Sequence, residues 1–177
     1  MAIVSQVRVN GSLHNLSDIE KAAIAGAAGS SQKFTGINTY EKSKVVVLGT
    51  TGTVTLTTAA NVGVQNLIVA TTGAVTYSLP TPRIGDVLKF NSVSEAIMGH
   101  NVIFSASGDD SVFFVGGLKH SDINADTAGV FSNGSSNAVL TLTVPTTLDI
   151  TMIGKSTTEW YLFGSVTQTA AITIANN

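Results

Sequence analysis

The fold is decided by the stretch VLTLTV at residues 139–144. Leu140, Leu142 and Val144 occupy every second position of this stretch, and threonines stand between them. Successive side chains of a β-strand point to opposite faces, so this spacing predicts a strand with one apolar face and one face of hydroxyl groups. Threonine suits such a strand because its β-branched side chain is stiff and fits the pleat.

Similar strand-like segments recur from Lys44 onward, about ten residues apart, with Gly, Pro, Asn and Asp between them. No segment after Gly29 has convincing helical periodicity, which argues against alternating strands and helices. The sequence therefore predicts an all-β fold, an antiparallel β-sandwich or jelly-roll-like domain over residues 44–177. We interpret residues 116–137 as one long connecting loop. The predicted strands are 44–48, 53–58, 66–70, 74–79, 86–90, 102–106, 111–115, 138–144, 148–153, 159–164 and 171–174.

Residues 1–43 form an N-terminal arm in this interpretation. Ile3, Val7 and Val9 follow a two-residue alternation that Ser5 interrupts, which predicts a short strand or an extended segment. The dipeptide Asn10-Gly11 that follows is typical of a tight turn.

The arm also contains the one segment that predicts a helix, residues 17–28. Ser17 and Glu20 have the spacing of a capping box, and glycines at 26 and 29 favour a helix end. The apolar stripe of this helix, carried by Ile19 and Ile24, is too narrow to hold a core alone. We therefore expect the helix to dock on a partner or on the β domain.

Composition excludes several classes of function. Among the 177 residues there is no cysteine, which rules out disulfides, a thiolate nucleophile and Cys-ligated metals. The net charge is −2 without a basic block, so no nucleic-acid partner is expected. No apolar run approaches the ~20 residues of a membrane helix, and the first residues lack the regions of a signal peptide.

The shortage of charge is the most informative feature of the composition. Charged residues make up 11% of the chain, against roughly 25% in ordinary soluble domains. The mean hydropathy is +0.33. A free monomer carries more surface charge than this for solubility, so we expect copies of the chain or a larger assembly to cover much of the surface.

No motif predicts a catalytic or metal site. Gly108-Asp109-Asp110 is similar to the paired-aspartate motif of viral RNA polymerases, but the chain is far too short for a polymerase and the tripeptide fits a hairpin turn. Asp122, Asn124 and Asp126 have the spacing that begins a calcium loop. Thr127 stands where that loop needs Gly, and Asn133 where it needs Glu, so we interpret the segment as a polar surface loop.

The histidines and the aromatic residues do not predict a functional site either. His14, His100 and His120 are scattered, and no G-x-S-x-G nucleophile motif accompanies them. The pair Trp160-Tyr161 is consistent with a carbohydrate platform, but a late strand of a sandwich more often buries the Trp in the core and leaves the Tyr at the rim.

The order of motifs in residues 74–164 resembles the β-modules of tailed-bacteriophage virion proteins. These motifs are Tyr-Ser-Leu-Pro-Thr-Pro at 77–82, Gly-Asp-Val-Leu-Lys-Phe at 85–90, Asn-Val-Ile-Phe at 101–104, and Thr-Glu-Trp-Tyr-Leu at 158–162. Such modules occur in capsid decoration (cement) proteins and in head or tail fibres. The arm is not part of the pattern.

Because the chain is short and lacks fibre repeats or a coiled coil, it is most similar to a decoration protein. The resemblance implies a homotrimer on the outer capsid surface of the virion that bridges neighbouring major capsid protein subunits against internal pressure. We expect no enzymatic activity, cofactor, metal ion or membrane contact. The arm residues expected to bind the capsid or a neighbouring copy are Ile3, Val4, Val7, Val9, Ile19 and Ile24.

Three alternatives stay open. The first is a short head or tail fibre, an adhesin module that binds host surface glycan. The second is a tail-tube or connector protein, which would assemble as a ring. The third is a glycan-cleaving virion enzyme, which needs two carboxylates about 5–10 Å apart. The sequence offers only Asp109 and Asp110 for such a pair.

Overall fold

The structure is a computed structural model that describes residues 6–9, 12–15, 44–92, 98–106, 111–122, 124 and 127–176. The chain divides into two compact units, residues 1–39 and residues 40–177. The sequence-based boundary between arm and β domain was placed slightly later, after residue 43.

The first unit contains a two-stranded antiparallel sheet of β1 (Gln6–Val9) and β2 (Ser12–Asn15). Its register brings Val9 opposite Ser12 and Val7 opposite His14. Val7 and Val9 therefore lie on β1, within the segment for which a strand was predicted. The other arm residues proposed for partner binding, Ile3, Val4, Ile19 and Ile24, lie outside the described residues, as does the helix predicted over 17–28.

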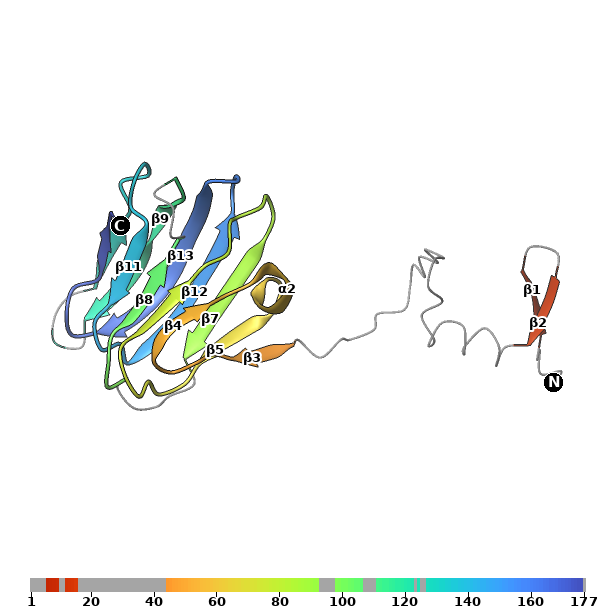
Figure 1. Cartoon of the computed structure of the whole chain (residues 1–177), viewed down its shortest axis with the longest axis horizontal. Helices are drawn as coiled ribbons and strands as arrows, with labels where there is room; N and C mark the ends of the chain where they lie inside the picture. Colours follow the sequence, from red (N-terminus) through yellow and green to blue (C-terminus); the bar gives the residue numbers. More distant parts are fainter. Residues whose placement is uncertain are drawn as a thin grey trace. The chain divides into compact units, whose positions relative to one another are not determined.

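The second unit is a sandwich of two β-sheets, which confirms the predicted all-β sandwich (Figure 1). The seven-stranded sheet has the order β10-β9-β13-β12-β7-β5-β3, and the five-stranded sheet has the order β14-β11-β8-β6-β4. Their bounds are β3 (Val45–Val47), β4 (Gly52–Thr55), β5 (Gln65–Ile68), β6 (Val75–Ser78), β7 (Val87–Ser92), β8 (Val102–Ser105), β9 (Phe113–Asp122), β10 (Ala128–Phe131), β11 (Val139–Leu142), β12 (Thr147–Gly154), β13 (Glu159–Gln168) and β14 (Thr173–Ala175).

The direction of the strands differs from the prediction of antiparallel pairing. Antiparallel pairs join β12 to β7 and β13, β9 to β10, and β11 to β8 and β14. Parallel pairs join β3 to β5, β5 to β7, β4 to β6, β6 to β8 and β9 to β13. From β3 to β9 successive strands alternate between the sheets, so a strand of the opposite sheet serves as the crossover that parallel neighbours require. Hydrophobic alternation carries no information about strand direction, which is why the sequence did not reveal this winding.

The core lies between the two sheets and is rich in aromatic side chains. Tyr77 and Phe104 from the five-stranded sheet pack with ring centroids 5.6 Å apart, and Phe90 from the opposite sheet packs edge-on against Phe104 at 4.8 Å. In β11, Leu140 and Leu142 are fully buried, as the alternation in residues 139–144 predicts.

Residues 116–137 are not the single long loop that their composition suggested. β9 continues through Gly116 and Gly117 to Asp122, and β10 returns antiparallel beside it. Glycine is common in loops, which is why the sequence predicted a loop here, but Gly116 and Gly117 lie within a strand. A short helix, α2 (Thr58–Asn61), was also not predicted. It is too short to show periodicity, and the Thr57 hydroxyl caps it by accepting a hydrogen bond from the Ala60 N–H at 3.3 Å.

Candidate functional site

The outer face of the seven-stranded sheet, which points away from the core, carries exposed aromatic side chains. On β13, Trp160 and Leu162 are fully buried, whereas Tyr161 is 45% and Phe163 39% exposed. The two exposed rings lie with centroids 5.7 Å apart. The prediction that Trp160 fills the core is therefore confirmed, whereas Tyr161 lies on the outer face of an interior strand and not at the rim.

Phe131 extends the exposed aromatic surface to the edge strand β10, where it is 75% exposed. It lies opposite Gly117 in the β9–β10 register, and a Cβ atom at Gly117 or Gly129 would overlap its ring or backbone. A Cβ at Gly116 would similarly press on the Tyr161 ring at 3.0 Å. The glycines thus let both aromatic rings lie close against the backbone of the sheet.

Half-buried aliphatic residues complete an apolar area around these rings. Tyr161 is in register with Ile153 of β12 and Val115 of β9, and Ile153 is in register with Val87 of β7. We call this set the aromatic patch. Its members are Val87, Val115, Phe131, Ile153, Tyr161 and Phe163. Exposed apolar surface that is contiguous across several strands marks a contact site.

The outer face next to the aromatic patch is polar but carries few charges. The Gln65 amide donates to Asn91 Oδ1, and Asn91 Nδ2 donates to Asp149 Oδ1 at 3.0 Å. Asp149 and Lys119 flank β13 on its two sides, since both are in register with Ser165. Among the described residues the only ion pair is elsewhere, between Lys155 and Glu159.

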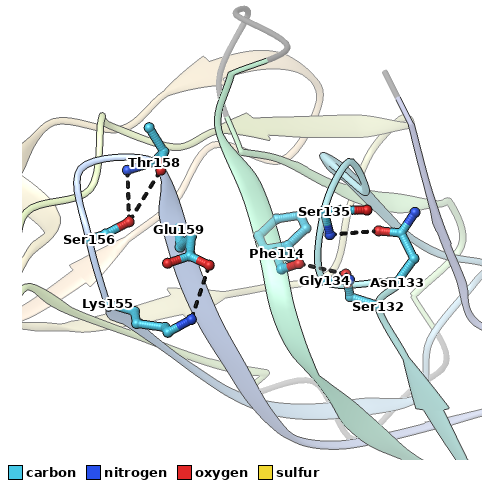
Figure 2. A network of polar contacts seen from close by, with 9 residues as sticks. All are labelled: Phe114, Ser132, Asn133, Gly134, Ser135, Lys155, Ser156, Thr158 and Glu159. Carbon is cyan, nitrogen blue, oxygen red and sulfur yellow. Dashed lines mark hydrogen bonds and ion pairs between the residues drawn. The ribbon is translucent and has the colours of Figure 1, made fainter.

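The loops at the end of the sheet nearest the aromatic patch are held by side-chain hydrogen bonds (Figure 2). Lys155 Nζ contacts Glu159 Oε1 at 3.0 Å, and the hydrogen bond from Lys155 is the main cause of the lowered pKa of Glu159. After β10, the Ser132 hydroxyl donates to the Phe114 carbonyl at 2.5 Å, and Asn133 Oδ1 accepts from the Ser135 N–H at 3.0 Å. These bonds fix the chain immediately after Phe131.

Within the β domain, His100 and His120 contact different backbone carbonyl groups. His100 Nδ1 lies 3.2 Å from the Thr71 carbonyl oxygen. The buried His120 has Nε2 at 3.1 Å from the Gln168 carbonyl oxygen. His14 lies on β2 of the first unit.

The acidic motifs do not assemble a metal site in the part of the chain that can be described. The Asp122 carboxylate accepts from the Asn124 N–H at 2.8 Å, which is a local turn contact. Asp126, Asp109 and Asp110 lie outside the described residues. Within those residues, no three His, Asp or Glu side chains come together in a way that could hold a metal ion.

The surface of the described β domain also contains a recess. A shallow recess of about 280 Å³ is lined by Gly63, Val64, Gln65, Val87 and Lys89. It is small for a ligand pocket, since such pockets span about 300–1,000 Å³. The open aromatic patch is therefore the better candidate site.

Sequence reasoning found part of the aromatic patch and missed the rest. The Trp160-Tyr161 pair indicated that Tyr161 lies outside the core, but Phe131 was assigned to a loop. The register that brings β10, β9, β13 and β12 together depends on long-range pairing, for which the local sequence carries no signal.

In the part of the chain that the structure covers, no helix has the length and apolar character that spanning a bilayer requires. No protein-family model, curated protein or solved structure matches this chain.

Proposed function

We propose that this protein is a structural virion protein that decorates the outer capsid shell and stabilises it by bridging major capsid protein subunits. The observation that carries the proposal is the low charge of the two-layer sandwich, with only 11% charged residues in the chain, which suits its surface to lasting contact with neighbours. Such a domain is suited to binding by surface contact. The resemblance of residues 74–164 to phage virion modules supports the choice of capsid.

The mechanism is the burial of surface by many copies. Each square ångström of apolar surface removed from water contributes roughly 25 cal/mol, less the cost of ordering the contact residues. The arm holds the capsid through Ile3, Val4, Val7, Val9, Ile19 and Ile24, while the β domain lies on the shell. Several arms in one homo-oligomer raise the avidity without a strong single contact. The resemblance implies that this oligomer is a trimer.

Co-sedimentation of the purified chain with capsids of its cognate phage tests the proposal. We expect the full chain to sediment with the capsids and to raise the temperature at which they release DNA. Removal of residues 1–29 abolishes this binding and leaves the circular dichroism of the β domain unchanged. Undiminished binding of the truncated chain would refute the role of the arm, and a full chain that does not bind capsids would refute the proposal.

A second function, a short head or tail fibre that binds host surface glycan, is favoured by the exposed pair Tyr161 and Phe163. Adjacent rings on an open sheet can stack on sugar rings, and the amides of Gln65 and Asn91 supply hydrogen-bonding groups elsewhere on the same face. Binding on a glycan array that the Tyr161→Ala substitution removes would establish this function in place of capsid decoration. An array without binding excludes it.

A further inference from the structure

We propose that the outer face of the seven-stranded sheet packs against the same face of a second copy of this chain, about a two-fold axis that runs along β13. This inference concerns the oligomeric part of the proposed function, and it replaces the expected trimer with a pair. The pair covers the aromatic patch, and capsid binding does not depend on it, because the proposed function assigns the capsid contact to the arm.

The size of the face fits a pairing of copies. The axis along β13 brings the five strands from β10 to β7 into contact, because two strands lie on either side of β13 within this set. Five strands spaced ~4.8 Å apart, with a mean length of about 7.6 residues at ~3.3 Å each, cover roughly 600 Å² per copy, which reaches the lower end of specific interfaces at about 1,200 Å² in total. One side of a standard protein–protein interface buries about 800 Å². A single sugar or a short peptide would leave most of this face open.

The charges on the face are complementary under the proposed rotation. Asp149 and Lys119 lie in register with Ser165, one strand to either side of β13. A two-fold axis along β13 exchanges the two flanking strands, so Asp149 of each copy faces Lys119 of the other. A self-complementary contact of this kind is characteristic of a symmetric dimer. The small Ser165 side chain between them allows the sheets to approach closely.

The apolar residues match under the same rotation. Tyr161 and Phe163 lie on the axis and meet their own counterparts, while Val115 of one copy faces Ile153 of the other. The resulting contact is apolar on both sides, and its strands run nearly parallel, as in aligned packing of two sheets.

The edge residue Phe131 also gains a partner. It lies opposite Gly117, one position after the Gly116–Leu162 pair, which places it on the same row as Phe163. Lys89 lies on this row at the other side, in register with Thr151. The rotation places the Lys89 ammonium of one copy over the exposed Phe131 ring of the other, which is a favourable cation–π arrangement.

The mass of the purified full chain, measured by analytical ultracentrifugation over a range of micromolar concentrations, tests the pairing. We expect twice the chain mass. Substitution of Tyr161→Ser or Phe131→Ser weakens the dimer at least tenfold, because each change enters a symmetric interface twice. Ile84→Ser is the matched control, since Ile84 is 81% exposed but lies in the turn before β7, off the face. Circular dichroism verifies that each variant is folded.

Charge reversal tests the geometry itself. Asp149→Lys and Lys119→Asp each place like charges in contact and weaken the dimer at least tenfold. An equimolar mixture of the two variants restores dimers, and Arg83→Asp, which changes the charge of an exposed turn residue by the same amount as Lys119→Asp, has no effect. A measured mass of one chain or of three chains overturns the pairing. A dimer that persists in both the Asp149→Lys and the Lys119→Asp variant also overturns it. Dimers that fail to bind capsids leave the pairing intact and refute only the decoration function.

Discussion

The indole nitrogen of Trp160 donates a hydrogen bond to the carbonyl oxygen of Pro80 at 3.3 Å, across 80 residues of sequence. Trp160 is fully buried at the start of β13, and Pro80 follows β6 in the opposite sheet. The bond therefore joins the two layers of the sandwich at the end of the core near the aromatic patch.

Trp160→Phe should lower the free energy of unfolding by about 1–3 kcal/mol, because it removes this hydrogen bond and leaves a small cavity. Urea unfolding followed by circular dichroism measures the change. Tyr161→Phe is the control, since it alters an exposed neighbour, and it should stay within about 0.5 kcal/mol of the natural chain. Equal losses from the two substitutions would contradict the assignment of Trp160 to the core.

The glycines under the aromatic patch give a second prediction. Gly116 has a φ of 93°, and a Cβ there would overlap the Leu162 carbonyl oxygen. Gly134 has a φ of 75° but has open space around it. Gly134→Ala should cost about 1–2 kcal/mol from the left-handed backbone alone. Gly116→Ala adds steric overlap and should cost clearly more. Thermal unfolding compares the two, and the same loss in both would exclude close packing at Gly116.

These glycines also illustrate how far the sequence predicts the fold. Alternation at residues 139–142 identified the buried Leu140 and Leu142 correctly, because period-two patterns are imposed by the geometry of a strand. Val144 was expected on the same apolar face, but β11 ends at Leu142, and Val144 is half-buried with a φ of 47°. Gly116 and Gly117 were assigned to a loop, since glycine is common in turns. β9 needs glycine at these positions because the Tyr161 and Phe131 rings of the neighbouring strands lie against its backbone. Only the tertiary structure shows that these rings are there.

The parallel pairing of the strands could not be predicted from the local sequence for a related reason. Strands such as β5 and β7 are parallel neighbours because the chain passes through β6 in the other sheet between them. The same hydrophobic pattern fits either strand direction. The aromatic patch depends on this topology, so of its residues the sequence indicated only Tyr161 as exposed.

Burial raises the pKa of Tyr77 to about 12, from an ordinary value near 10. The folded chain therefore holds the Tyr77 proton more tightly than the unfolded chain does. The stabilisation is complete below pH 10 and is lost as the pH rises toward 12. Tyr77→Phe also loses the hydrogen bond to the Gly49 carbonyl at 2.8 Å, so it should be less stable at pH 8. The difference between the two proteins should shrink above pH 10, whereas parallel stability profiles would contradict the raised pKa.

The buried amide of Asn66 gives a fourth prediction. Its Oδ1 accepts from Asn61 Nδ2 at 2.8 Å, and its Nδ2 donates to the Asn61 carbonyl at 3.0 Å. Asn66→Ala leaves the buried Asn61 amide without this partner and should destabilise the fold by about 2–3 kcal/mol. Gln65→Ala changes the preceding residue, which points to the outer face, and should cost much less. Denaturant unfolding of both variants decides whether the inner amide pair is the stabilising one.

The most direct test of the decoration function is electron cryomicroscopy of intact particles of the cognate phage. The account predicts density for the two-layer sandwich at repeated positions on the outside of the shell, each touching more than one major capsid protein subunit. Finding the chain only in the tail, or not at all in purified particles, would contradict it.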